Sequence, residues 1–148
     1  MTQQQKKAVL GLSGGVDSSV AALRLQRAGY EVHACYLDIG LGGEESARVT
    51  AERLGLAFTV LPVAEELERH VCSKFYEGYL SGRTPIPCAL CNPTVKFPSL
   101  LALADRVGAP YVATGHYARI GTGRDGGPIL LRGMGGNDQS YMLARLPR

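Results

Sequence analysis

The segment Gly11–Ser19 carries residue types that bind phosphate, and it lies between an apolar run and a helical pattern. Its consecutive glycines, Gly14 and Gly15, let a phosphate approach the backbone closely. The free N–H groups and the dipole of a helix that begins there favour an anion. The segment also offers hydroxyl donors and a carboxylate suited to a magnesium ion, at Ser13, Asp17, Ser18 and Ser19. It therefore predicts a nucleotide site.

The spacing of these residues narrows the kind of nucleotide site. A Walker A loop needs a lysine after its glycines, and a dinucleotide fingerprint needs G-x-G-x-x-G; this segment has neither. The order Ser-Gly-Gly-x-Asp-Ser instead resembles the pyrophosphatase (PP) loop of the N-type ATP pyrophosphatases, which adenylate a substrate and release pyrophosphate. The alternative interpretation is a glycine-rich strand-to-helix turn with a serine cap.

Cys88 and Cys91 are separated by two residues in the proline-rich stretch Thr84–Pro93, ahead of a helical pattern. A helix N-terminus lowers the pKa of a thiol, so the pair is suited to thiolate chemistry. The same side chains are potential ligands of a metal or an iron–sulfur cluster, although two cysteines do not complete such a site. A disulfide redox role is a third interpretation. The other cysteines, Cys35 in a strand and Cys72 on a helix, are interpreted as core thiols.

Further polar residues follow the fourth expected strand. Gly115 permits close approach to a nucleotide, and His116 is placed to hydrogen-bond or polarise a substrate oxygen. His33, inside a strand, and His70, on a helix, are interpreted as structural. The stretch Asn137–Tyr141, taken alone, predicts a helix N-cap at one of its first two residues.

Alternating strand and helix patterns must position these residues. Apolar runs predict strands at 7–10, 31–37, 57–61, 109–114 and 129–132, and helices at 18–28, 44–54, 64–80, 95–107 and 139–146. The three prolines of 84–93 predict a loop there. The alternation predicts an α/β fold, a Rossmann-like parallel sheet of about five strands with helices on both faces. Ligands of such sheets bind beyond the carboxyl ends of the strands, where Ser13, Leu37 and Gly115 fall.

Length and composition predict one domain in the cytoplasm. The 148 residues suffice to bury a core, and a formal charge of +3 is compatible with RNA without arguing for it. No apolar run approaches the ~20 residues of a membrane span, and the polar start of the chain has no signal region. Four cysteines in such a chain favour metal, catalytic or core roles over a disulfide framework.

Taken together, the motifs resemble the N-terminal domain of the tRNA-specific 2-thiouridylases (the MnmA/TrmU family) over nearly the whole chain. The matching segments are Gly11–Ala22, Gly82–Pro85, Pro87–Asn92, Lys96–Phe97, Ala113–Arg119 and Asp138–Tyr141. Other PP-loop enzymes share the first segment but not this series. The resemblance implies an adenine nucleotide alpha hydrolase-like PP-loop domain across residues 1–148, as the N-terminal part of a longer enzyme.

The resemblance also implies a reaction. ATP, with Mg²⁺, adenylates the C2 oxygen of the wobble uridine of a tRNA, and a protein-borne sulfur then displaces AMP to give 2-thiouridine. The expected partners are tRNA, a sulfur-donor protein such as a cysteine desulfurase relay, and further domains in cis or in trans; no membrane is involved. By position, Asp17 and Cys91 would be catalytic, with Asp17 also holding Mg²⁺. ATP would contact Gly11, Leu12, Ser13, Gly14, Gly15, Val16, Asp17, Ser18, Leu37 and Gly115. The tRNA would contact Ile86, Pro87, Cys88, His116, Asn137, Asp138 and Gln139.

Several residues depart from the family pattern. Ile86-Pro87-Cys88 stands where many members have Asn-Pro-Asp, and Cys88 favours an oxygen-sensitive [4Fe–4S] cluster with Cys88 and Cys91 among its ligands. Asn137 replaces a lysine, and the family's second cysteine, which carries the persulfide, falls beyond the end of this chain. Two other functions stay open: a PP-loop adenylating enzyme with a small-molecule substrate, and a non-catalytic domain that binds adenine nucleotide.

Overall fold

The computed structural model describes residues 6–147, which form two compact units. The first unit holds the described residues up to 65 together with 96–115. The second holds 66–95 together with the described residues from 116 onward. The polar start of the chain, residues 1–5, and the last residue, Arg148, lie outside the described part.

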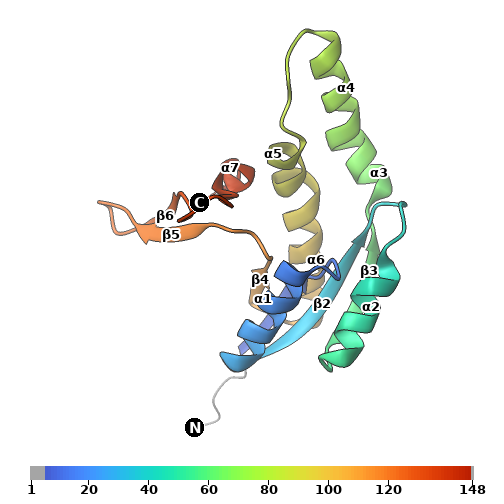
Figure 1. Ribbon diagram of the computed structural model, residues 1–148, viewed down its shortest axis with the longest axis vertical. Helices are drawn as coiled ribbons and strands as arrows, with labels where there is room; N and C mark the ends of the chain where they lie inside the picture. Colours follow the sequence, from blue (N-terminus) through green and yellow to red (C-terminus); the bar gives the residue numbers. More distant parts are fainter. Residues whose placement is uncertain (1–5, 148) are drawn as a thin grey trace. The chain divides into compact units, whose positions relative to one another are not determined.

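A parallel sheet of four strands forms the centre of the first unit (Figure 1). Its strands are β1 (Lys6–Gly11), β2 (Tyr30–Asp38), β3 (Ala57–Pro62) and β4 (Tyr111–Ala113), in the order β3-β2-β1-β4. β1 pairs in parallel with both β2 and β4, so the direction in which strands are added reverses beside β1. In parallel sheets, ligands bind in the crevice beyond the carboxyl ends of the strands at such a reversal.

Helices cover both faces of this sheet, as predicted. α1 (Val16–Arg27) and α2 (Glu44–Arg53) lie on one face, and α6 (Phe97–Val107) lies on the other (Figure 1). Neighbouring strand residues belong to different cores because successive side chains point to opposite faces. Leu10 and Ala34 pack with α1 and α2, whereas Val9 and Cys35 pack with Leu100 of α6. Burial on both faces explains why the middle positions of these strands are mostly apolar.

Helical segments and a hairpin make up the second unit, which begins at Glu66, within α3 (Ala64–Leu67). α3, the π-helical turn η1 (Glu68–Cys72) and α4 (Ser73–Leu80) follow one another without a break, which confirms the helix predicted over 64–80. β5 (Arg119–Thr122) and β6 (Pro128–Leu131) form an antiparallel hairpin, and α7 (Ser140–Leu143) follows it. The strand expected at 129–132 is therefore β6, outside the parallel sheet. The connection from β5 is too short for a parallel crossover and suits an antiparallel pair.

The proline-rich stretch is more helical than predicted. α5 (Pro87–Cys91), the π-helical turn η2 (Asn92–Lys96) and α6 are continuous along the chain, so the loop prediction is wrong beyond Ile86. Pro87 takes the first position of α5, where a helix does not need the missing N–H. Pro93 falls within η2, whose wider turn replaces the regular α-helical hydrogen bonds. Among the described residues, no helix combines the length and the apolar character needed to cross a membrane.

Candidate functional site

The loop between β1 and α1 is held by its own serine hydroxyls. The buried Ser18 hydroxyl donates to the carbonyl of Gly15 (3.1 Å) and accepts from the backbone N–H of Ser13 (3.2 Å). Because that uses the one proton of Ser18, the Ser13 hydroxyl donates across the 3.2 Å contact between the two Oγ atoms. Ser19 Oγ also donates to the Gly15 carbonyl (2.8 Å). Ser13 is exposed, so its hydroxyl is the one most easily redirected to a phosphate.

Gly14 is required by both its backbone conformation and its surroundings. Its φ is +80°, and a Cβ built on it would lie 2.5 Å from Ser46 Oγ and 2.7 Å from the nitrogen of Ala47, in the first turn of α2. Ser46 Oγ also donates to the Gly14 carbonyl (3.4 Å). The loop is thus close to the N-terminal ends of two helices, α1 and α2, whose dipoles both favour an anion.

Gly115, two residues past the end of β4, closes the other side of this loop. A Cβ at Gly115 would lie 3.0 Å from the nitrogen of Ser18 and 3.1 Å from the carbonyl carbon of Asp17. The backbone after β4 therefore packs directly on the first turn of α1. The topology places both segments beside the strand reversal, so the structure brings together the predicted PP loop and Gly115.

The remaining residues that the sequence predicts to contact ATP lie around the same strand ends. Val16 and Asp17 open α1 and are exposed, and Leu12 is buried with its N–H bonded to the carbonyl of Cys35 (2.8 Å). Leu37, near the carboxyl end of β2, packs partly buried against the core on the α6 side. The exposed carboxylate of Asp17 is a hard oxygen donor, which suits Mg²⁺.

Two residues interpreted as structural are confirmed in that role. His33 Nε2 lies 2.8 Å from Thr59 Oγ1 on the neighbouring strand, and burial, with a smaller effect of the Lys7 charge, lowers the pKa of His33. Cys35 is buried in the core, and burial raises the pKa of its thiol to about 12. The hydrogen bond of His33 within the sheet and the burial of Cys35 in the core suit structural roles.

Cys88 and Cys91 lie within α5 itself, not in a loop ahead of a helix. Cys88 is the second residue of this helix and is exposed, whereas Cys91 is its last residue and is half-buried. Burial and the nearby Glu68 raise the pKa of the Cys72 thiol, which makes it less reactive. Within residues 6–147, no group of three or more His, Cys, Asp or Glu side chains is arranged to hold a metal ion. Among the described residues, Cys88 and Cys91 alone do not complete the ligand set of a [4Fe–4S] cluster.

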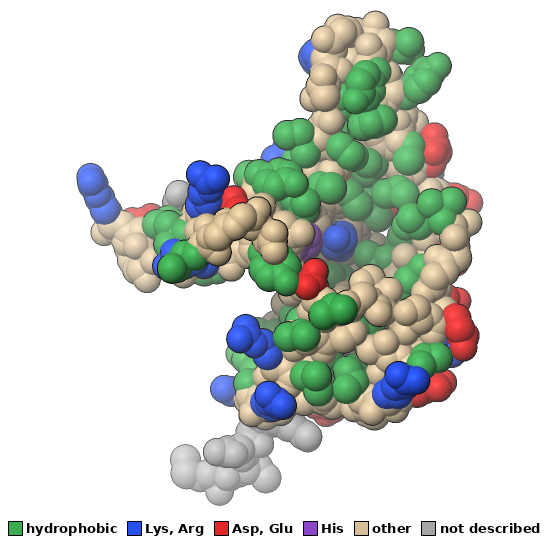
Figure 2. All heavy atoms as spheres, viewed as in Figure 1, with side chains coloured by type: hydrophobic (Ala, Val, Ile, Leu, Met, Phe, Trp, Pro, Cys, Tyr) green, Lys and Arg blue, Asp and Glu red, His purple; other side chains and the backbone are tan. Residues whose placement is uncertain are grey.

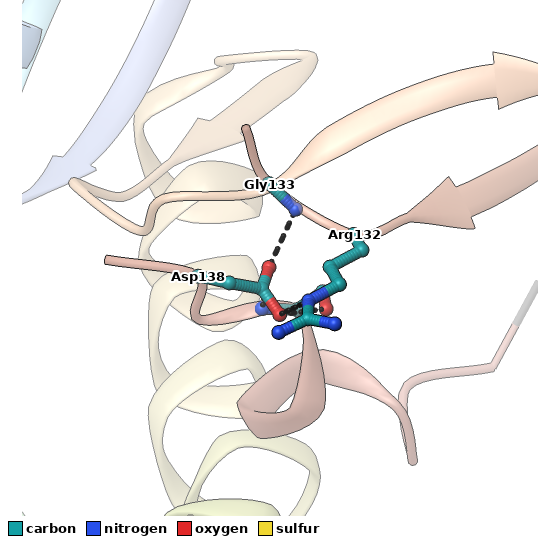
Figure 3. Close-up of polar contacts among 4 residues, drawn as sticks. Arg132, Gly133 and Asp138 are labelled. Carbon is teal, nitrogen blue, oxygen red and sulfur yellow. Dashed lines mark hydrogen bonds and ion pairs between the residues drawn. The ribbon is translucent and has the colours of Figure 1, made fainter. Parts of the chain in front are cut away.

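The expected tRNA-contact residues all lie in the second unit. Ile86, Pro87, Cys88 and Asn137 are exposed. The side chain of Asp138 accepts hydrogen bonds from the N–H of Gly133 (2.6 Å) and from the N–H and hydroxyl of Ser140 (Figure 3). Together with the 3.9 Å ion pair to Arg132, these bonds lower the pKa of the Asp138 carboxyl.

Gln139 ties this turn to the residue after His116. Its N–H donates to the carbonyl of Tyr117 (2.7 Å), and its Oε1 accepts from the N–H of Tyr117 (3.0 Å). Gln139 is the N-cap of α7 and makes no side-chain cap bond, so the predicted cap at Asn137 or Asp138 is wrong by one or two positions. The side chain of Asp138 instead accepts a hydrogen bond from the Ser140 N–H. Short polar side chains readily form a turn of this kind.

The second unit also exposes apolar side chains. Tyr76, Tyr79 and Leu80 on α4 are exposed, and hydrophobic side chains gather over this helix in Figure 2. An exposed apolar surface of this kind is typical of an interaction site. Amphipathic spacing along α4 does not by itself say which face of the helix stays uncovered.

The structure adds two residues that sequence reasoning missed. Ser46 contacts the PP loop from the first turn of α2, and no local pattern marks it. Asn92 is buried beside Cys91, and its Nδ2 donates to the carbonyl of Met142 (2.8 Å). In the sequence, Asn92 could have been noticed as a polar residue directly after the Cys-x-x-Cys pair.

Comparisons with known proteins agree with this geometry. The family described as "tRNA methyl transferase HUP domain" matches residues 6–148. Proteins named tRNA-specific 2-thiouridylase MnmA from Acidithiobacillus ferrooxidans and Halorhodospira halophila are each 44% identical to this chain, over 93% and 100% of it. The chain spans less than half the length of these curated relatives, 41% and 42%. A crystal structure of a predicted subunit of tRNA methyltransferase from Methanocaldococcus jannaschii has a similar fold, with a TM-score of 0.57 at 22% identity, over 74% of this chain and 52% of that one.

Proposed function

This chain belongs to the tRNA methyl transferase HUP domain family, and from that premise we propose that it is the ATP-using part of a tRNA-specific 2-thiouridylase. The C2 oxygen of the wobble uridine attacks the α-phosphorus of ATP, and pyrophosphate leaves. The outer sulfur of a cysteine persulfide then attacks C2, and AMP leaves with the oxygen. A second cysteine thiolate, which we assign below to Cys91, attacks the inner sulfur and breaks the S–S bond, so that 2-thiouridine and a protein disulfide form. Adenylation is needed because a carbonyl oxygen is a poor leaving group, whereas AMP is a good one.

The geometry of the PP loop carries the proposal. The loop places the exposed Ser13 hydroxyl and the first turn of α1 beside the first turn of α2, where the phosphates would bind. Asp17 would hold Mg²⁺, which when bound offsets the phosphate charge that opposes attack. Leu37 and Gly115 flank the loop at the ends of β2 and β4 and would contact the nucleotide.

The second unit would supply the sulfur and tRNA chemistry. We assign Cys91 as the thiol of the sulfur-transfer step, and Ile86, Pro87, Cys88, His116, Asn137, Asp138 and Gln139 as the tRNA contacts. Exposure supports this for Ile86–Cys88 and Asn137, whereas Asp138 and Gln139 use their side chains to hold backbone groups and so shape the contact surface. A sulfur-donor protein and the part of the longer relatives that this chain does not cover would complete the enzyme, in the cytoplasm.

A titration of the chain with ATP and Mg²⁺ tests the nucleotide site. Asp17→Asn should weaken the affinity by about tenfold, equivalent to about 1.4 kcal/mol, and the loss should shrink in the absence of Mg²⁺. Asp105→Asn, which changes an exposed carboxylate on α6, is the matched control and should have no effect. Equal ATP affinities for the wild type and Asp17→Asn would show that Asp17 does not contribute to ATP binding.

Pyrophosphate release tests the substrate. With the remaining domains supplied, release should depend on a tRNA that has uridine at the wobble position and should fall when that base is cytidine. Release that responds to a small acid and not to tRNA would favour a small-molecule adenylating enzyme instead. An absence of any turnover under these conditions would leave only nucleotide binding.

A further inference from the structure

Asn92 is a buried polar residue next to the thiol that we assign to sulfur transfer. It follows Cys91 directly, begins η2 and is 1% exposed. Its Nδ2 donates to the carbonyl oxygen of Met142 at 2.8 Å, between residues 50 positions apart. Its Oδ1 is buried and has no hydrogen-bond partner in the described part of the chain.

Packing alone does not explain an amide at this position. A buried amide oxygen without a partner is unfavourable, and an apolar side chain of similar size would fill the space without that cost. The amide of Asn92 provides an N–H donor for the Met142 carbonyl, which a leucine side chain does not. That carbonyl belongs to α7, a helix of four residues, and the last carbonyls of any helix have no partner within it.

The other end of α7 is tied just as closely. Gln139 exchanges two hydrogen bonds with Tyr117, and Asp138 holds the turn through Gly133 and Ser140. One series of hydrogen bonds therefore runs from the helix of Cys91, through Asn92 and α7, to Gln139 and Tyr117. All of these residues belong to the second unit.

We propose that Asn92 is a positioning residue, which holds the Cys91 thiol in register with the turn of Asp138 and Gln139. This inference rests on the proposed function, in which Cys91 transfers sulfur and that turn contacts tRNA. Loss of the Asn92 donor should lower kcat for thiolation much more than it raises KM for tRNA, because the contacts remain while the thiol moves relative to them. ATP affinity should stay unchanged, since the nucleotide residues belong to the other unit.

The test compares the full chain with Asn92→Leu, Asn92→Asp and the control Thr94→Val. Asn92→Asp keeps the size but loses the donor toward Met142, and Thr94→Val removes a hydroxyl that bonds the Leu90 carbonyl within the same helix (2.7 Å). Amide exchange of Met142, Ala144 and Leu146, whose N–H groups are bonded within the α7 segment, reports on α7. Iodoacetamide alkylation of Cys91 across pH, resolved by mass spectrometry, reports on the thiol.

Both Asn92 variants should speed exchange in α7 by roughly three- to tenfold, as expected for the loss of one hydrogen bond. They should also change the alkylation rate of Cys91 and its pH midpoint. Thr94→Val should do neither, and buried Cys35 should stay unreactive in every variant, which excludes general unfolding. If both Asn92 variants show the same α7 exchange rates and the same Cys91 alkylation rates as the wild type, the proposal is overturned. Neither measurement needs thiolation, so a Cys91→Ser enzyme that still thiolates tRNA would refute the role of Cys91 separately.

Discussion

Gly115 lies so close to Ser18 that a methyl group added to the glycine would come within 3.0 Å of the serine nitrogen. The two residues belong to different segments, one after β4 and the other in the first turn of α1. Their contact fixes the N-terminal end of α1 against the neighbouring strand end. The first turn of α1 is where we place the phosphates, so the shape of the nucleotide site depends on this glycine.

Gly115→Ala should therefore weaken ATP binding. The added methyl group must displace the backbone of Asp17 or Ser18, and backbone cannot move aside as a flexible side chain can. We expect a loss of about tenfold in affinity, or about 1.4 kcal/mol, by isothermal titration calorimetry. Gly136→Ala is the control, because a Cβ there meets nothing within 4 Å and the glycine has no positive φ. Similar affinities for the two variants would show that the first turn tolerates the displacement.

Acid should destabilise the wild type more than a His33→Asn variant. Burial first, and then the charge of Lys7, lowers the pKa of His33 below its ordinary value of 6.5, although Glu31 acts in the opposite direction. The unfolded chain then binds more protons than the folded one as the pH falls below 6.5, so stability is lost between 6.5 and the lower folded pKa. Urea unfolding at pH 7 and pH 5 measures this. Both proteins have the same carboxylates, so only His33 should make their acid responses differ. An equal loss of unfolding free energy between pH 7 and pH 5 in both proteins would contradict the role of His33.

The four cysteines should differ in their reaction with iodoacetamide. Cys88 is exposed and should react first at pH 8, whereas Cys72 should react more slowly because burial and Glu68 raise the pKa of its thiol. Cys35, with a thiol pKa of about 12, should react only after denaturation. Peptide mass spectrometry after timed quenching gives the order. Early modification of Cys35 would mean that the core between the sheet and α6 opens readily.

Asp138→Ala should loosen the turn before α7. The carboxylate accepts the N–H groups of Gly133 and Ser140, so both amides should exchange faster with deuterium in the variant. Asn137→Ala, a change at the exposed neighbour, should leave them unchanged. Because hydrogen bonding, first of all from Gly133, lowers the pKa of Asp138, its stabilising effect is present above 3.8 and is lost as the pH falls through the folded value. Acid should thus also lower the protection of the Gly133 and Ser140 amides against exchange. Unchanged protection of Gly133, in acid or in the variant, would contradict this role of Asp138.

Local patterns in the sequence were sufficient for the fold class and for identifying the candidate nucleotide loop. Each strand of the parallel sheet is a short apolar run, and each helix that covers it has its own periodic pattern. The glycines and serines of Gly11–Ser18 are consecutive, so their chemistry is visible without any knowledge of the rest of the molecule. The prediction for 84–93 was wrong because a π-helical turn at Asn92–Lys96 accommodates Pro93, and that depends on packing around Asn92.

The sequence by itself thus determined the fold class and which segment is the candidate phosphate-binding loop, because both depend on residues that are neighbours along the chain. Only the tertiary structure decided that Gly14 meets Ser46, that Gly115 meets Ser18, and that Asn92 meets Met142. It also decided that the strand at Pro128–Leu131 forms a hairpin instead of extending the parallel sheet. These contacts join residues far apart in sequence, and their partners follow from strand order and the close packing of helices, which no local pattern contains.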